Sequence, residues 1–168
     1  MVHPSRRNCF AATDADRKIL ETITKYGWTI MYVHGNAPHP DFAFSIGVSE
    51  RFGHPEFVVA GLDRAPSAWV LNRLGEHVRD GRVFDPSHEG SGLLSGILLN
   101  DARIAFRTIE RVRYRQLFGT AMWYYGGDEF PMLQVFIPDP QGHFPWDPVF
   151  SENRAAQVLE GTSPPFAS

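Results

Sequence analysis

Asp41–Leu62 reads DFAFSIGVSERFGHPEFVVAGL, and this stretch decides more of the fold than any other. Its two ends, Phe42–Val48 and Glu56–Leu62, are rich in aromatic and β-branched residues, which is typical of strands. The polar segment Ser49–Glu56 between them contains Pro55, which stiffens the chain and predicts a turn. We therefore expect a rigid strand–turn–strand unit.

Helix patterns lie on both sides of this unit. Apolar residues at helical spacing predict a helix over Asp14–Tyr26, ended by Gly27, and a second over Ala65–Arg79. The other predicted elements are one helix, Tyr114–Tyr125, and four strands, Trp28–Val33, Arg82–Phe84, Arg103–Arg113 and Phe130–Ile137. Because helices alternate with runs of strands and the connections are irregular, we expect an α+β fold: a single domain with a mostly antiparallel sheet of about five or six strands and packed helices.

The composition is that of an ordinary globular protein. The chain has 168 residues, of which 43% are hydrophobic and 13% aromatic, and a chain of this length can bury a sizeable core. No internal repeat or linker divides it. We expect one domain over residues 13–150, an N-terminal tail over 1–12 and a partly disordered C-terminal extension over 151–168.

Charge and cysteine content narrow the class of protein. The formal net charge of -3 argues against a dedicated nucleic-acid binder, which is usually basic. Cys9 is the only cysteine, so no intramolecular disulfide can form, which fits a reducing compartment. No segment has the apolar length of a signal peptide or of a membrane span, which needs about 20 residues. We therefore expect a cytoplasmic protein that does not enter a membrane.

Several short motifs occur in a fixed order along the chain. They are Tyr26-Gly27-Trp28, Phe44-Ser45-Ile46-Gly47, His54-Pro55-Glu56, Gln134, Pro138-Asp139 and Gly142-His143-Phe144-Pro145-Trp146. With them the chain resembles the bacterial domain-of-unknown-function family 4262, over roughly Arg17 to Pro148. The resemblance implies a family and a boundary. It implies no activity, no cofactor and no functional role for any residue.

His54 and Glu56 are the best candidates for catalysis. Histidine titrates near neutral pH and a carboxylate can orient it, so the two can act as general acid and base. If the segment is extended, residues i and i+2 lie on one face of a strand, and both side chains reach one pocket. The alternative is structural: His54 bonds within a tight turn, while Glu56 caps a helix or pairs with an arginine.

Other residues would complete such a pocket. Ser45 lies on the neighbouring strand, and Tyr125 and Trp146 offer aromatic walls. Gln134 needs a hydrogen-bond partner if it is buried, and Asp139, between two prolines, suits an Asx turn. The ligand-binding candidates are Ser45, Tyr125, Gln134, Asp139 and Trp146. Trp146 has an alternative role as an anchor that fixes the terminal segment to the core.

Two further groups of residues are weaker candidates. The histidines have neither the helical spacing nor the cysteine partners of a zinc site, so no metal site is predicted among His34, His39, His54, His88 and His143. Four arginines alternate along one predicted strand, where they either bind an anion or remain solvated. These are Arg103, Arg107, Arg111 and Arg113. A flavin or another anionic cofactor would use this face, but the sequence identifies no cofactor.

The sequence leaves two functions open. It lacks the signatures of α/β-hydrolases, P-loop nucleotidases and Rossmann dehydrogenases. The first function is a small-molecule enzyme or ligand binder, with a pocket where the His54–Glu56 turn meets the C-terminal segment Pro138–Pro148. The second is a non-catalytic protein-interaction or immunity-type accessory module.

Overall fold

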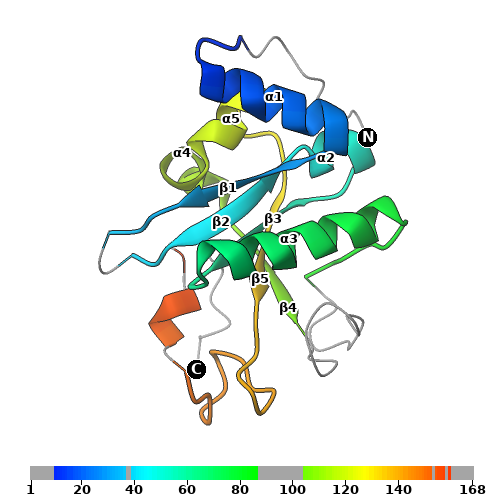
Figure 1. Cartoon of the computed structure of the whole chain (residues 1–168). Helices are drawn as coiled ribbons and strands as arrows, with labels where there is room; N and C mark the ends of the chain where they lie inside the picture. Colours follow the sequence, from blue (N-terminus) through cyan, green and yellow to red (C-terminus); the bar gives the residue numbers. More distant parts are fainter. Residues whose placement is uncertain (1–9, 37–38, 87–103, 153, 158, 160–168) are drawn as a thin grey trace.

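A five-stranded sheet forms the centre of the protein (Figure 1). In this computed structural model, residues 10–36, 39–86, 104–152, 154–157 and 159 are described. The strands lie in the order β1-β2-β3-β5-β4. β3 and β5 run parallel, and the other three neighbouring pairs are antiparallel. The strands are β1 Thr29–Val33, β2 Phe42–Ile46, β3 Glu56–Ala60, β4 Ala105–Thr108 and β5 Met132–Phe136.

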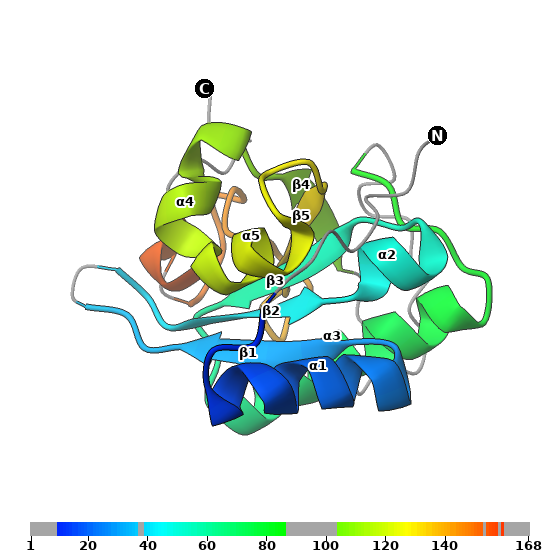
Figure 2. The same ribbon diagram turned by 90° about the horizontal axis from the view of Figure 1, so that it is seen from above.

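Helices cover both faces of this sheet (Figure 2). α3 packs on one face, where it contacts β1, β2 and β3. α1, α4 and α5 lie on the other face. The helices are α1 Asp14–Tyr26, α2 Val48–Phe52, α3 Arg64–Arg79, α4 Tyr114–Leu117 and α5 Gly119–Tyr125, with 3-10 helices at Arg111–Arg113 and Arg154–Gln157. The arrangement is the single α+β domain, with a mostly antiparallel sheet, that the sequence predicts.

Strand β3 divides the core into two layers. Phe57 and Val59 belong to the α3 layer, while Val58 and Ala60 belong to the layer of α1, α4 and α5. All residues of β3 are buried, as expected for a strand covered on both faces. Burying each Phe or Val side chain contributes about 1.5–3 kcal/mol, so these layers account for much of the driving force for folding.

The predicted turn at Ser49–Glu56 is wrong in its first half, where the chain forms α2 instead. Gly47 precedes this helix and Gly53 follows it, and both have left-handed backbones, with φ 114° and φ 66°. A glycine adopts this conformation without steric cost, so the chain can leave β2, make one helical turn and re-enter the sheet. The unit is strand–helix–strand.

The predicted helix over Tyr114–Tyr125 is divided at Phe118. This residue has φ −125° and ψ 43°, outside the helical region, and it separates α4 from α5. Its ring is fully buried, 5.2 Å from the ring of Phe44. The packing of one aromatic side chain into the core therefore overrides the helical periodicity of the sequence.

The predicted strand Arg103–Arg113 is also too long. β4 covers only Ala105–Thr108, and the chain turns into a 3-10 helix at Arg111–Arg113. The predicted continuous arginine face is therefore wrong, because among the three described arginines Arg107 lies on the strand, whereas Arg111 and Arg113 lie in the 3-10 helix. Arg82–Phe84 forms no strand either.

Several predictions fall on residues outside the described part of the chain. These are Cys9, His88, Arg103, most of the N-terminal tail and residues 160–168. Within the predicted C-terminal extension, Arg154–Gln157 forms a 3-10 helix that contacts β3.

Candidate functional site

Glu56 holds a carboxylate inside the core, at the first residue of β3. The residue is 0% exposed. Its Oε2 accepts a hydrogen bond from Ser45 Oγ at 2.5 Å, and its Oε1 accepts from the backbone amides of Gly47 and Ser49 at 2.8 and 3.1 Å. The hydroxyl of Tyr125 also donates to Oε1. Four donors from three parts of the chain therefore converge on one side chain.

The local sequence explains why these donors converge. Gly47 ends β2 with its left-handed turn, so its amide and that of Ser49 point back from the start of α2 toward β3. Ser45, on β2, uses its hydroxyl twice, since it also accepts from the Phe57 amide at 3.0 Å. Tyr125 reaches the carboxylate from the end of α5. Glu56 thus ties the strand–helix–strand unit to α5.

Burial and hydrogen bonding act on the Glu56 carboxyl in opposite directions. Burial raises its pKa above the usual value, and the bonds from Ser45, Tyr125, Ser49 and Gly47 oppose the rise because they favour the ionised form. Burial and the neighbouring carboxylate both raise the pKa of Tyr125. Tyr125 therefore acts as a neutral hydrogen-bond donor.

His54 lies in the opposite layer from Glu56, so the predicted acid–base pair is not formed. The His54 ring is 5.1 Å from the ring of Phe57 and 5.8 Å from that of Phe84, in the α3 layer. Glu56 shares its face of β3 with Val58. The i, i+2 rule fails here because β3 begins only at Glu56, which leaves His54 outside the strand.

Both ring nitrogens of His54 are engaged with the backbone. Nε2 accepts from the Phe84 amide at 2.9 Å, which requires an unprotonated Nε2. Nδ1 then carries the proton and donates to the Pro55 carbonyl at 2.8 Å. Burial lowers the pKa of His54, in agreement with a neutral ring. His54 fixes the chain after α3 to the start of β3.

This state of His54 predicts a loss of stability in mild acid. The folded pKa lies below the usual value of 6.5, so the unfolded chain binds the proton first as the pH falls, and the free energy of unfolding decreases below about pH 6.5. One such group changes the stability by at most about 1.4 kcal/mol per pH unit. His54→Gln keeps an acceptor for the Phe84 amide without a titrating ring. We expect the variant to have a shallower acid slope in urea unfolding between pH 7.5 and pH 5.

Two other groups also change the unfolding free energy between pH 7.5 and pH 5. The effect of His54 is therefore measured as the difference in acid slope between the wild type and His54→Gln. Burial, Arg82 and Arg73 lower the pKa of His77, which adds to the acid loss. Glu56 acts in the opposite direction, because its raised pKa makes folding less favourable as the pH rises. An identical slope in the wild type and in His54→Gln would contradict the assignment.

Asp139 organises the C-terminal loop and does not meet His54 or Glu56. Its Oδ1 accepts from the amides of Gln141 and His143 at 3.0 and 2.8 Å, and its Oδ2 accepts from the amide and hydroxyl of Ser151 at 2.9 and 3.0 Å. The bond to Gln141 confirms the predicted Asx turn. Burial alone would raise the pKa of Asp139, but the bonds from Ser151, His143 and Gln141 hold it well below its usual value.

Trp146 and Gln134 each lie apart from Glu56, in contact with other segments of the chain. The Trp146 ring stacks on Phe144 at 4.9 Å, and the Arg107 guanidinium lies 4.5 Å above it, which agrees with the anchor role. Gln134, which is fully buried on β5, donates from Nε2 to the carbonyl of Gln157 in the C-terminal 3-10 helix. The predicted ligand-binding residues therefore lie in separate places, and only Ser45 and Tyr125 meet Glu56.

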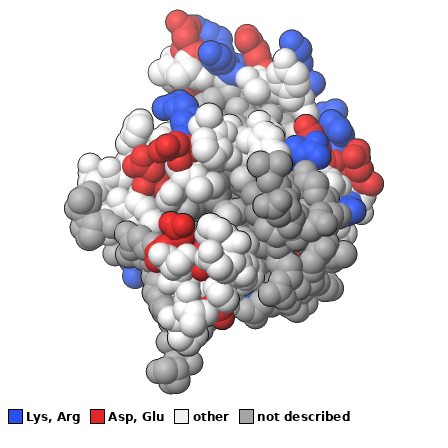
Figure 3. Space-filling model, turned by 60° about the horizontal axis from the view of Figure 1, so that its bottom comes forward, with Lys and Arg blue, Asp and Glu red and all other residues white. Residues whose placement is uncertain are grey.

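The histidines and the arginines are the two weaker candidate groups from the sequence. Within these residues, no group of three or more His, Cys, Asp or Glu side chains could hold a metal ion. Figure 3 shows one face of the molecule, where basic and acidic side chains are interspersed among the described residues. Arg107 packs on Trp146 and donates to the Phe106 carbonyl at 2.9 Å.

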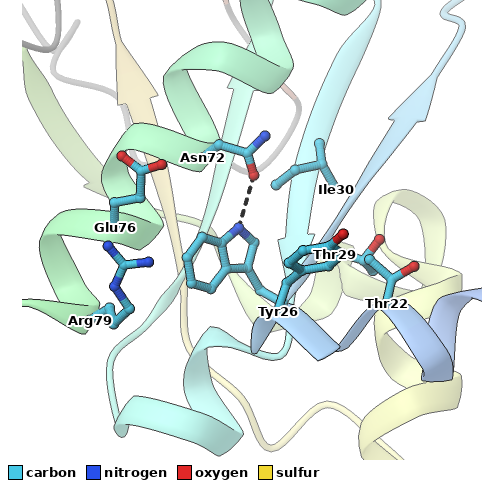
Figure 4. Close-up of a pocket in the computed structure, with 8 residues that line it drawn as sticks. Thr22, Tyr26, Thr29, Ile30, Asn72, Glu76 and Arg79 are labelled. Carbon is cyan, nitrogen blue, oxygen red and sulfur yellow. Dashed lines mark hydrogen bonds between the residues drawn. The ribbon is translucent and has the colours of Figure 1, made fainter. Parts of the chain in front are cut away.

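A groove between α1 and α3 is a concave surface built entirely from described residues (Figure 4). Its volume is about 450 Å³. The side chains of α1 line one wall, those of α3 line the other, and β1 lies between them. The lining residues are Thr22, Tyr26, Trp28, Thr29, Ile30, Asn72, Glu76 and Arg79.

The sequence Tyr26-Gly27-Trp28 builds this groove. Gly27 ends α1 in the left-handed conformation with φ 97°, which reverses the chain into β1. Tyr26 remains 60% exposed on the α1 wall, while Trp28 turns inward with 7% exposure. Trp28 Nε1 donates to Asn72 Oδ1 at 2.9 Å (Figure 4). The motif contributes to the family resemblance, but the sequence alone gives it no role.

Gly75 allows α3 to lie directly on Trp28. A Cβ atom at position 75 would lie 2.6 Å from Trp28 Cε2, closer than any normal contact. The groove floor therefore depends on a glycine in the middle of a helix, where glycine is otherwise unfavourable.

A second, smaller cavity lies near Glu56. It has about 130 Å³ and is lined by α1, Gly47, Glu50, Arg51 and Tyr124. The Tyr124 hydroxyl donates to Glu50 Oε2 at 2.6 Å. This volume is well below the roughly 300 Å³ at which small-molecule pockets begin.

Comparison with known proteins gives a family and no function. A family model described as "Domain of unknown function (DUF4262)" matches residues 22–151, which is well over half of the chain. No curated protein and no solved structure matches. Among the described residues, the helices are too short or too polar to cross a membrane. The match begins at Thr22, the first groove residue, and extends through Ser151, the partner of Asp139.

Proposed function

We propose that this chain, which belongs to the DUF4262 family, is a non-catalytic interaction module that binds a segment of a partner protein in the groove between α1 and α3. The groove itself is the observation that carries the proposal. It combines an exposed tyrosine, an exposed arginine and an open strand on one surface. Tyrosine and arginine are enriched among residues that dominate binding energy at protein interfaces.

The contacts of the predicted catalytic residues support this choice over an enzyme. Both nitrogens of His54 and both oxygens of Glu56 are used within the fold. Neither residue lines the groove or the smaller cavity. A catalytic pair must present a free position to a substrate, and a structural role needs none.

The proposal is tested by selecting peptides that bind the protein and then measuring their affinity for variants with substituted groove residues. The full chain would be used to select binders from a phage-displayed library of random linear octapeptides, and their affinities would be measured by fluorescence polarisation. The groove variant combines Tyr26→Ala with Arg79→Ala, since both side chains are exposed and their loss should leave the fold intact. We expect it to weaken binding by at least about tenfold, or 1.4 kcal/mol.

Phe10→Ala is the matched control, because Phe10 is 80% exposed and does not line the groove. We expect it to change affinity by less than about twofold. Failure to select any binder, or binders that keep their affinity for the groove variant, would contradict the proposal.

A further inference from the structure

The open edge of β1 lies at the bottom of the groove. β1 is the first strand in the sheet order, so it has a strand neighbour, β2, on one side only. Within the described residues, no further strand pairs with it. α1 lies above β1 and α3 below it in Figure 1, and both helices contact this strand.

The hydrogen-bond pattern shows which backbone groups face outward. The Gly61 amide donates to the Asp41 carbonyl at 2.9 Å, so the backbones of Asp41 and Ala43 point toward β3. Bonding alternates along an antiparallel strand, so Phe42 and Phe44 bond to β1 through Val33 and Met31. The amides and carbonyls of the intervening residues, Ile30 and Tyr32, must therefore point away from the sheet.

These groups have no other backbone partner in the described part of the chain. Exposed strand edges are normally blocked because they pair with other chains. Here the edge is flanked by two helical walls rather than blocked, and Ile30 lines the groove between them. The groove therefore offers a donor and an acceptor at strand spacing, which is the complement of an extended peptide backbone.

We infer that the partner binds as an added strand along β1, in hydrogen-bonding register with Ile30 and Tyr32. This inference rests on the proposed function and specifies the occupant of the same groove. Alternate peptide side chains would face the two walls. On the α3 side a side chain would meet Ile30, Asn72 and Arg79, which suits an apolar stem with an amide or carboxylate head. On the α1 side it would meet the Tyr26 ring.

The walls argue for an isolated segment and against a second copy of this chain. A second β1 paired at this edge would bring its own α1 and α3, which flank its β1 in the same way, alongside the two helical walls of the first copy (Figure 1). A peptide strand has no flanking helices and needs only the space of the groove.

Proline substitution tests the inference on the protein side. Ile30→Pro removes an outward amide and places the proline ring where the added strand would lie, while all β1–β2 bonds remain. We expect the affinity for the selected octapeptides to fall at least about tenfold, since a lost hydrogen bond and a steric block act together. Ile30→Ala, which keeps the amide, should lose less than about threefold. Met31→Pro should destabilise the fold, because the Met31 amide belongs to the β1–β2 ladder.

Peptide chemistry provides a second test that does not depend on how the variants fold. Single N-methylation at successive peptide positions should abolish binding at alternate positions only, because every second amide faces β1. Equal effects at all positions, or unchanged binding by Ile30→Pro, would overturn the strand mode. If the Tyr26/Arg79 variant still weakens binding in that case, the groove function survives. If that variant binds normally, the proposed function fails as well.

Two other occupants would be detected in the same series. A dimer in sedimentation velocity that Ile30→Pro dissociates would overturn the inference in favour of a second copy. A full chain that binds no peptide until residues 161–168 are deleted would show that the chain's own end fills the groove, which would also overturn it.

Discussion

Replacing Glu56 with alanine is expected to lower the free energy of unfolding by about 3–5 kcal/mol, because several buried hydrogen-bond donors lose their shared acceptor at once. The change removes the acceptor for the Ser45 and Tyr125 hydroxyls and for the Gly47 and Ser49 amides. The Gly47 amide would keep its longer bond to the Tyr125 hydroxyl at 3.2 Å, but the Ser49 amide and the two hydroxyls would lose the acceptor they donate to. Each buried donor left without an acceptor costs about 1–3 kcal/mol before relaxation or water entry. Urea unfolding monitored by tryptophan fluorescence measures the loss.

Three variants separate this role from a general effect of losing a carboxylate. Glu56→Gln keeps an acceptor oxygen but turns an amide donor toward other donors, so we expect an intermediate loss. Tyr125→Phe removes one donor to Glu56 and a long-range acceptor for the Gly47 and Glu50 amides, at 3.2 and 3.4 Å, and should cost less, about 1–2 kcal/mol. Glu76→Ala removes a half-buried ion pair with Arg73 near the surface, which is worth about 1 kcal/mol or less. A loss below about 1 kcal/mol for Glu56→Ala would show that water can replace the carboxylate.

Gly75→Ala is expected to destabilise the protein by about 1–3 kcal/mol, although alanine is the better helix former. Helix propensity alone favours the alanine by up to about 1 kcal/mol. The added methyl group would lie 2.6 Å from Trp28 Cε2, so the ring or the helix must move. Trp28 is 7% exposed and bonded to Asn72, which leaves the ring little room.

Removing the Trp28 ring tests whether its clash with the added methyl group causes the destabilisation. In a Trp28→Leu background, Gly75→Ala should become neutral or stabilising, which a double-mutant cycle in urea would measure. Gly119→Ala is the matched control, because nothing lies within 4 Å of its added Cβ and it sits at the start of α5. We expect no loss there. A destabilisation at Gly75 that persists without Trp28 would contradict the packing explanation.

Sequence patterns predict the elements whose local and tertiary preferences agree. The predicted helix Asp14–Tyr26 has the bounds of α1, and the predicted helix Ala65–Arg79 lies within α3. The predicted helix Tyr114–Tyr125 fails at Phe118, where packing of the ring into the core divides it. The predicted strand Arg82–Phe84 fails because the Phe84 amide bonds to the His54 ring and not to a neighbouring strand. Neither interaction leaves a periodic pattern in the sequence.

The candidate site is harder to predict than the fold. The sequence singles out Glu56, Ser45 and Tyr125, and the structure brings these three together. It pairs Glu56 with His54 on the condition that the chain is already extended at His54. β3 begins only at Glu56, as the predicted strand Glu56–Leu62 does, so this condition is not met. The groove escapes prediction because it combines Tyr26 and Asn72, which belong to different helices and carry no motif in common.

The parallel pairing of β3 with β5 has a consequence for how the chain assembles. β1, β2 and β3 follow one another along the chain and pair as neighbours, whereas β5 must return to β3 from beyond α3 and β4. Closing this longer loop costs more chain entropy than closing either of the two local pairs. Tyr125 lies on the returning segment, shortly before β5. The hydroxyl that completes the set of donors around Glu56 therefore lies beside the strand whose pairing spans the longest stretch of chain. The buried carboxyl group gains all four donors only when β5 has paired with β3.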